Sequence, residues 1–150
     1  MSLKQVARGE FVGYGTAYQA TKHRAEQAAF ASSLGVTVFR PSVIFGDPRG
    51  KMEFATQLLR DMVRPPVPAV DFFSAFGQHK GPVRMSPVHV EDVAEAFARA
   101  LDDDSTIGQT YELGGTDVMT WGDMVRMVAG ACGRTKWLLP VPIEIMSVAA

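Results

Sequence analysis

The chain has 150 residues, 47% of them apolar, and a formal net charge of −1. This composition is normal for a globular protein and excludes a disordered chain, and the length suffices for one domain with a hydrophobic core. A net charge near zero gives no sign of binding to nucleic acid or to an anionic membrane surface.

The cysteine count and the pattern of apolar residues bear on the compartment. The single cysteine, Cys132, excludes an internal disulfide, and with only three scattered histidines beside it we expect no metal site. No stretch approaches the ~18 to 20 apolar residues that a membrane span needs. The first ten residues lack the apolar segment of a secretion signal. These features predict a soluble, cytoplasmic protein.

The first predicted elements are a helix, a strand and a second helix. The first helix runs from about Thr16 to Leu34 and is stopped by Gly35. The strand is Val36 to Arg40, which is rich in β-branched residues and is ended by Pro41. Apolar residues at helical spacing predict the second helix from Met52 to Val63.

The alternation continues after this point. The proline-rich segment Arg64 to Val70 cannot be helical, and we expect a loop with a short edge strand there. After it we expect a strand at Val83 to Val90 and a helix with Val93, Ala94, Phe97 and Leu101 on one face. A strand in "QTYELGG" follows, and then a helix that Thr120 and Asp123 open as a capping box and that Gly133 stops. An extended stretch at Trp137 to Leu139 and a last helix near Ile143 come after these.

Alternating strands and helices predict an α/β fold with a largely parallel sheet. The segment Val36 to Arg40 has the character of a parallel strand that is buried on both faces. It is nevertheless the first strand predicted in the chain. Its natural neighbours would lie upstream, so we expect one edge of this strand to be unpaired.

Tyr18 and Lys22, in the stretch "YQATK", lie four positions apart in the first predicted helix and therefore share one face. A tyrosine phenol has a pKa near ~10, and a neighbouring ammonium group lowers that pKa because it favours the phenolate. Such a tyrosine can exchange a proton with a substrate hydroxyl while a hydride moves to or from a cofactor. The alternative is that these are two ordinary residues on an ordinary helix, since the spacing is common by chance.

The sequence around this pair resembles a known family. The stretch "AYQATKHRAEQAAFASSLGVTVFRPSVIFG" is similar to the core of the extended short-chain dehydrogenase/reductases, the NAD-dependent epimerase/dehydratase family, in which a Tyr–Lys helix precedes a strand that ends in Arg-Pro. "SPVHVEDVAEAFARAL" and "GQTYELGG" resemble later elements of that family, so the resemblance covers nearly the whole chain. Within the family, the likeness is greatest to the branch related to an accessory subunit of respiratory complex I.

The resemblance implies a fold and a set of cofactor contacts. The fold would be the C-terminal part of a Rossmann-like doubly wound sheet, at about 16–63, and a small substrate-binding subdomain with the last core elements, at about 64–150. Tyr18 would be the general acid/base, and Lys22 would lower its pKa and hold the nicotinamide ribose of NAD or NADP. Pro41, Ser42 and Val43 would line the nicotinamide pocket, or would only end a strand.

The implied substrate contacts each have a simpler explanation. Arg84, with Lys80 and His79, could attract a substrate phosphate, but a solvated basic patch is the preferred interpretation. His89 could contact substrate, although a core histidine with a satisfied hydrogen bond is preferred. Asp92 is best explained as a carboxylate in the first turn of a helix, where the helix dipole stabilises it.

The chain departs from the family pattern in two respects. It has no Gly-rich turn between a first strand and a helix, where the family binds the dinucleotide phosphates, and no trustworthy equivalent of the catalytic Ser or Thr upstream of the tyrosine. It also has "RMSPVHV" where sugar-nucleotide epimerases often carry an Arg-Asp-aromatic run, which disfavours a nucleotide-sugar substrate. We therefore expect the C-terminal half of an enzyme, with no tight binding of NAD or NADP to this chain.

Two functions remain open at this point. The first is a fragment of an NAD(P)-dependent oxidoreductase or epimerase that acts on a secondary alcohol or ketone and is inactive alone. The second is a non-catalytic scaffold or assembly module that keeps the fold. In either case an unpaired strand edge and bare helix faces predict a homo-oligomer. The alternative is a monomer in which Met1 to Val12 folds back and caps the edge.

Overall fold

The computed structural model describes residues 2–6, 17–47, 49–50, 52–75 and 80–145, with the backbone alone for 2–6 and 17–19. The chain forms two compact units, each built from separate stretches of sequence. The first unit comprises residues 1–42 and 88–115, and the second comprises residues 43–87 and 116–150. None of the helices within the described residues is long and apolar enough to cross a membrane.

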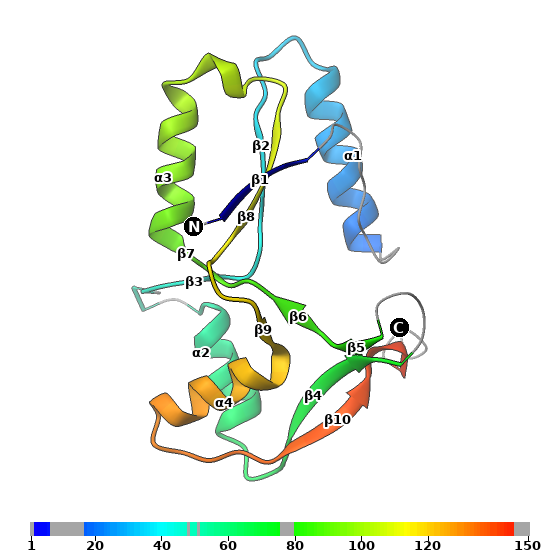
Figure 1. The fold of residues 1–150 in the computed structure, drawn as a ribbon, viewed down its shortest axis with the longest axis vertical. Helices are drawn as coiled ribbons and strands as arrows, with labels where there is room; N and C mark the ends of the chain where they lie inside the picture. The colour runs from blue at the N-terminus through cyan, green and yellow to red at the C-terminus, as the bar shows by residue number, and fades with distance from the viewer. Residues whose placement is uncertain (1, 7–16, 48, 51, 76–79, 146–150) are drawn as a thin grey trace. The chain divides into compact units, whose positions relative to one another are not determined.

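The first unit contains a three-stranded sheet in the order β1-β8-β2, with α1 and α3 on its two sides (Figure 1). β2 and β8 pair in parallel, as predicted, but β1 runs antiparallel to β8, so in the described residues this sheet is mixed and not largely parallel. The elements of this unit are β1 (Ser2–Val6), α1 (Ala17–Ala31), β2 (Val38–Pro41), β7 (Val88–His89), α3 (Val90–Leu101), η2 (Asp104–Thr106) and β8 (Thr110–Gly114).

The core of the first unit lies between this sheet and α3. Leu113 in the middle sheet strand is 1% exposed, and it forms one cluster with Val88, Val93 and Ala96. The ring of Phe39 on β2 lies 5.7 Å from that of Tyr111 on β8. A parallel pair with apolar residues of this kind is typical of a sheet that is covered on both faces.

The predicted unpaired edge is present in the described part of the chain. Within those residues, β2 pairs with β8 on one side and with no strand on the other. The N-terminal segment does fold back onto the sheet, but β1 pairs with β8 and not with β2. β1 therefore does not cover the open edge of β2, the strand that the sequence predicts to be buried on both faces.

Two boundaries in the first unit differ from the prediction, the end of α1 and the position of β2, which is Val38–Pro41 and not Val36 to Arg40. α1 ends at Ala31 and not at Leu34, because the Ser32 hydroxyl donates a 2.6 Å hydrogen bond to the carbonyl of Ala29 and so competes with further helical bonding. Gly35 does not cap the helix. It gives room to Ile107, whose Cδ1 would lie 3.0 Å from a Cβ placed at residue 35.

The second unit is built on β4 (Ala69–Ser74), which lies between β10 (Leu138–Pro142) and β5 (Gly81–Pro82). β10 pairs with β4 in parallel, and β5 pairs with it antiparallel. The prediction of a short edge strand within Arg64 to Val70 is therefore wrong, because the strand there, β4, is the central strand of this sheet. The other elements of the unit are β3 (Ile44–Phe45), α2 (Phe54–Leu58), η1 (Leu59–Val63), β6 (Arg84–Met85), β9 (Met119–Thr120), α4 (Trp121–Ala131) and η3 (Ile143–Ile145).

Helix ends in the second unit follow the sequence signals closely. The predicted capping box is present, because the Thr120 hydroxyl accepts a bond from the N–H of Asp123 and the Asp123 carboxylate accepts one from the N–H of Thr120. Gly133 follows the end of α4 with a φ of 64°, a backbone conformation that favours glycine. The predicted helix from Met52 to Val63 begins at Phe54 and ends in a π-helical turn.

The predicted strand from Val83 to Val90 is interrupted. Arg84 and Met85 form β6 in the second unit, whereas Val88 and His89 form β7 in the first. Pro87 lies between them and cannot donate to a strand ladder, which accounts for the break. Val90 already belongs to α3.

Glu53 caps the N-terminus of α2. Its carboxylate accepts hydrogen bonds from the N–H groups of Ala55 and Thr56 and from the Thr56 hydroxyl, at 2.6 to 2.8 Å. Burial is the largest single influence on the pKa of Glu53 and raises it, but these hydrogen bonds together lower the pKa below its usual 4.5. The ionised form is therefore favoured in the folded state.

A pH dependence of stability follows for Glu53. Because the folded-state pKa is the lower one, the contribution of Glu53 is fully present above pH 4.5 and is lost as the pH falls through the folded value. We expect Glu53→Gln to lower the unfolding midpoint at pH 7 and to change it much less near pH 3. Urea unfolding at both pH values, followed by circular dichroism, measures this. An equal destabilisation at both pH values would contradict the assignment.

Candidate functional site

The proton-transfer candidates Tyr18 and Lys22 both lie in α1. A separation of four residues in one helix places their Cα–Cβ bonds on the same face, as predicted. The side chain of Lys22 is exposed. Most of the described side chains of α1 are exposed, and its half-buried positions recur at helical spacing from Ala20 to Phe30.

An ion pair fixes this helix to the sheet. Arg40 at the end of β2 donates from Nη2 to Oε1 of Glu26 at 2.7 Å and from Nε to Oε2 at 3.2 Å. The two side chains are only 23% and 13% exposed. A two-point contact of this kind is stronger and more specific than a single surface pair. It holds the face of α1 that carries Lys22, because Glu26 lies four residues further along the same helix.

The Arg40–Glu26 pair was not predicted from the sequence. Arg40 was noted only as part of the Arg-Pro end of the strand. The sequence does indicate an acidic group on this side of α1, because Glu26 follows Tyr18 and Lys22 at four-residue intervals and so shares their helix face. Sequence spacing alone does not show which cation meets that acidic group.

The predicted nicotinamide-pocket residues follow the same strand. Pro41 is the last residue of β2 and is exposed. Ser42 is half-buried, and its N–H donates a 2.8 Å hydrogen bond to the carbonyl of Leu113, which extends the pairing with β8 past the proline. Tyr18, Lys22, Pro41 and Ser42 therefore belong to one unit, whereas Val43 belongs to the other.

His89 is the N-cap residue of α3. Its Nδ1 accepts a hydrogen bond from the N–H of Glu91 at 3.3 Å and lies 3.8 Å from the Glu91 carboxylate. The side chain is 39% exposed, so the expected core location is wrong, although a hydrogen bond is present as expected. Asp92 lies in the first turn of this helix, as predicted. Both residues thus have a structural role at the start of α3.

The predicted basic run is in the second unit. Arg84 lies on β6 opposite Thr120 and is exposed, and Lys80 is exposed as well. His79 lies outside the described residues. An exposed position is what a solvated basic patch requires, and it leaves Arg84 accessible to an anion.

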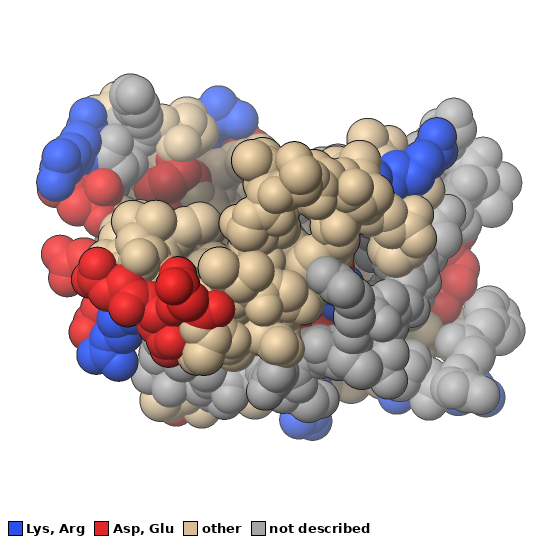
Figure 2. Space-filling model, turned by 90° about the horizontal axis from the view of Figure 1, so that it is seen from above, with Lys and Arg blue, Asp and Glu red and all other residues tan. Residues whose placement is uncertain are grey.

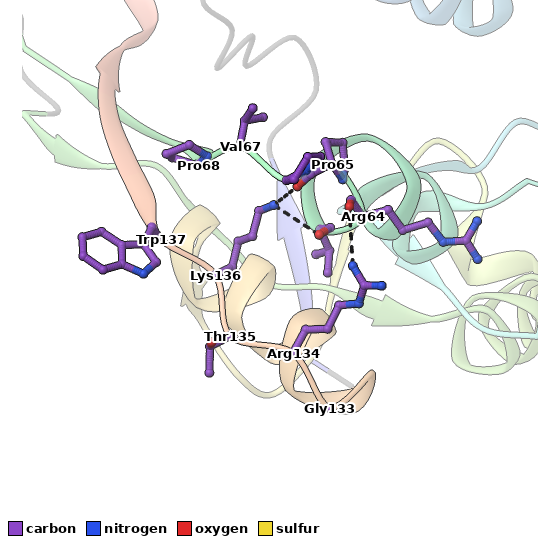
Figure 3. A pocket seen from close by; sticks show the side chains of 11 residues that line it. Arg64, Pro65, Val67, Pro68, Gly133, Arg134, Thr135, Lys136 and Trp137 are labelled. Atoms are coloured by element: carbon purple, nitrogen blue, oxygen red, sulfur yellow. Dashed lines mark hydrogen bonds between the residues drawn. The ribbon is translucent and has the colours of Figure 1, made fainter.

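A groove of about 660 Å³ in the second unit was not predicted (Figure 3). Two segments line it, the end of η1 with the loop that follows it, at residues 63–68, and the loop after α4, at residues 133–137. Lys136 donates from Nζ to the carbonyls of Val63 and Pro65, and Arg134 donates to that of Arg64. These cations satisfy carbonyl groups at the C-terminal end of η1, where the helix dipole is negative, so the groove is explained by helix capping.

The starts of the described helices do not fit a dinucleotide pyrophosphate. Phosphate binding there needs free N–H groups and a positive local field. Acidic residues instead occupy the first turns or caps: Glu53 at α2, Glu91 and Asp92 at α3, and Asp123 at α4. Three of the four described α-helices thus repel a phosphate at their N-termini, and the segment that precedes α1 lies outside the described residues. In the described part of the chain, no three His, Cys, Asp or Glu side chains gather in a possible metal site.

Comparison with known proteins gives the family. A profile of the NAD dependent epimerase/dehydratase family matches residues 4–114. The mitochondrial NADH dehydrogenase [ubiquinone] 1 alpha subcomplex subunit 9 of Arabidopsis thaliana is 32% identical over an alignment of length 134, which covers 86% of this chain and 30% of that protein.

Two solved structures share the fold. The dTDP-4-dehydrorhamnose reductase of Bacillus anthracis, in complex with NADP, superimposes with a TM-score of 0.65 at 17% identity, covering 85% of this chain and 41% of the reductase. The UDP-glucose 4-epimerase of Thermus thermophilus, in complex with NAD, gives 0.58 at 22% identity, covering 92% and 47%. The chain spans less than half of each of these proteins. With a profile match over most of its length, the chain belongs to the NAD-dependent epimerase/dehydratase family.

Proposed function

We propose that this chain is the proton-transferring part of an NAD(P)-dependent oxidoreductase or epimerase that acts on a secondary alcohol or ketone. The observation that carries the proposal is the placement of Tyr18 and Lys22 on one face of α1, which the Arg40–Glu26 pair ties to the end of β2. A helix fixed to a strand in this way can hold a proton donor in a constant position.

In this proposal each residue has one task. NAD(P), held by another part of the protein, would supply the hydride chemistry at the substrate carbon. Tyr18 takes the hydroxyl proton of the alcohol as the carbonyl forms, and returns a proton to the oxygen in the reverse direction. Lys22 favours the phenolate of Tyr18 through its positive charge. Pro41 and Ser42 contribute backbone groups beside the reacting carbon.

The proposal places the dinucleotide phosphates on a part of the protein that this chain does not contain. The acidic N-termini of α2, α3 and α4 support this, because none of them favours a phosphate. The relatives support it too, since the chain spans only 41% and 47% of two family structures whose complexes contain NADP and NAD. The chain alone is therefore inactive in this proposal.

The second candidate function is an assembly module without catalysis. The observation that favours it is the 32% identity to a protein named as a subunit of NADH dehydrogenase. In this case α1 and the sheet serve as scaffold, and Tyr18 passes no proton.

A chimera distinguishes the two functions. The dinucleotide-binding part of the Thermus thermophilus epimerase is fused ahead of Met1, and the product is tested for bound NAD and for turnover of secondary alcohols and nucleotide sugars. Turnover with bound NAD supports the enzyme, and bound NAD without turnover of any substrate supports the scaffold. A folded chimera that binds no NAD would contradict the view that the two parts complement each other.

A further inference from the structure

Helix α1 has a single carboxylate, and it shares a helix face with the proposed proton-transferring pair. Between Ala17 and Ala31, Glu26 is the only acidic residue of the sequence. It follows Lys22 by four residues, as Lys22 follows Tyr18, so the three residues lie along one side of the helix. A carboxylate in this position attracts the ammonium group of Lys22 and opposes its effect on Tyr18, because a negative charge disfavours the phenolate.

Glu26 is bonded to Arg40 on the neighbouring strand. The guanidinium of Arg40 donates to both carboxylate oxygens, at 2.7 and 3.2 Å, and the two side chains are only partly exposed. A Lys–Glu pair at four-residue spacing on a helix surface is weak, and it is weaker when the lysine comes first. A partly buried, two-point arginine–carboxylate contact is stronger. Glu26 is therefore expected to prefer Arg40 to Lys22, whose side chain is exposed.

A second carboxylate, Glu112, lies beside Arg40 in the sheet. Arg40 on β2 pairs in register with Glu112 on β8, and Glu112 pairs in register with Lys4 on β1, so the three residues belong to one face of the sheet. If Arg40 loses its charge, Glu112 keeps a lysine at the opposite register position. Glu26, in contrast, is then left with Lys22 at four-residue spacing on its own helix.

The remaining acidic residues in the described part of the first unit lie on α3 or directly after it, and α3 is on the other side of the sheet from α1: Glu91, Asp92, Glu95, Asp102, Asp103 and Asp104. Figure 2 shows acidic side chains gathered on the α3 side of the face seen from above. Of the other basic groups of α1, Arg24 is exposed, and a histidine such as His23 carries no charge at the alkaline pH where tyrosines titrate. Glu26 and Glu112 are thus the acidic groups on the α1 side of the described sheet.

We propose that Arg40 neutralises Glu26 and keeps this carboxylate from pairing with Lys22, so that the ammonium charge of Lys22 acts on Tyr18. Arg40 is then a positioning residue, because it acts through Lys22 and not on the substrate. This role of Arg40 rests on the proposed proton transfer by Tyr18. It differs from a mechanical tie between α1 and β2, because a tie needs both partners of the ion pair, whereas neutralisation is needed only while Glu26 is present.

Removing the two charges separately and together tests the proposal. The pKa of the Tyr18 phenol is measured in this chain by NMR with ¹³C at the ζ carbon of tyrosine, and Tyr18→Phe identifies its signal among the three tyrosines. Lys22→Met should raise this pKa by about 0.5 to 1 pH unit toward the usual ~10. Arg40→Met should raise it by about half as much, because Glu26 then offsets part of the Lys22 charge. Glu26→Gln alone should not raise it, and Arg40→Met/Glu26→Gln should return it to within about 0.1 pH unit of the original value.

Two further variants separate this effect from a loss of structure. Arg99→Met removes a guanidinium from the Arg99–Glu95 ion pair of α3, in the same unit, and should leave the pKa of Tyr18 unchanged. Arg40→Lys keeps the positive charge but loses the planar two-point contact, and it should keep the pKa of Tyr18 near its original value. Far-UV circular dichroism at each pH of the titration shows that the compared chains are folded.

The outcomes distinguish this role of Arg40 from the proposed function. Equal shifts in Arg40→Met, Glu26→Gln and the double variant would overturn the proposal, because they would show that the ion pair only ties α1 to β2. If Lys22→Met raises the pKa of Tyr18 and Arg40→Met does not, the role of Arg40 alone is refuted. If Lys22→Met itself leaves that pKa unchanged, Lys22 does not act on Tyr18, and the proposed proton transfer fails together with this inference.

Discussion

Replacing Tyr18 with phenylalanine is expected to lower kcat by about 10²- to 10⁴-fold in the chimera that carries a dinucleotide-binding part. The substitution removes only the phenol hydroxyl, and with it the group that exchanges a proton with the substrate oxygen. Affinity for NAD should stay unchanged, because the phosphates bind elsewhere. Steady-state rates measured with saturating NAD, beside a calorimetric titration with NAD, separate these two effects.

Tyr111 provides the matched control for this experiment. It lies on β8 in the same unit, is half-buried, and stacks on Phe39 through its ring. Tyr111→Phe removes an identical hydroxyl and should change kcat less than about twofold. If Tyr18→Phe and Tyr111→Phe have the same small effect in a chimera that turns over substrate, Tyr18 is not the proton donor.

Replacing Leu113 with alanine is expected to destabilise the first unit by about 2 to 5 kcal/mol, which is the usual cost of removing a buried leucine side chain. Leu113 is 1% exposed and sits in the strand between β1 and β2, in the cluster with Val88, Val93 and Ala96. The cavity cannot close easily, because strands flank this residue on both sides. The loss is a large part of the ~5 to 15 kcal/mol that stabilises a typical domain.

Urea unfolding followed by far-UV circular dichroism measures this loss. Both tryptophans, Trp121 and Trp137, lie in the second unit, so tryptophan fluorescence does not report on the first unit directly. Leu34→Ala is the control, because the same three carbon atoms are removed from a side chain that is 75% exposed. A loss below about 1 kcal/mol for Leu113→Ala would mean that the sheet of the first unit is not the packed core described here.

Much of the fold could be predicted because local signals agree with the packing. The Thr120 capping box and Gly133 mark the two ends of α4 as the sequence indicates. The apolar segment around Val38 becomes a parallel strand with an open edge in the described residues. The central position of β4 could not be predicted, because strand order depends on β10, some 70 residues away in the sequence, and on no local pattern.

The candidate site could be predicted only in part. The four-residue spacing of Tyr18 and Lys22 is a local property of one helix, and the structure places both residues on α1. The partner of Arg40 could not be predicted, since Glu26 competes with other acidic residues until the helix is placed on the sheet. His89 was misplaced because the strand after Pro87 is only two residues long, so that His89 both ends β7 and caps α3, with its side chain exposed.

The measurement that tests the central claim most directly is a titration of this chain, as it is, with NADH. If the chain carries the proton-transferring pair and lacks the phosphate-binding part, no saturable binding should appear up to about 1 mM, by calorimetry or by NADH fluorescence, for NADH or for NADPH. Binding with a dissociation constant in the micromolar range would contradict the account, because it would show that these residues hold the dinucleotide by themselves.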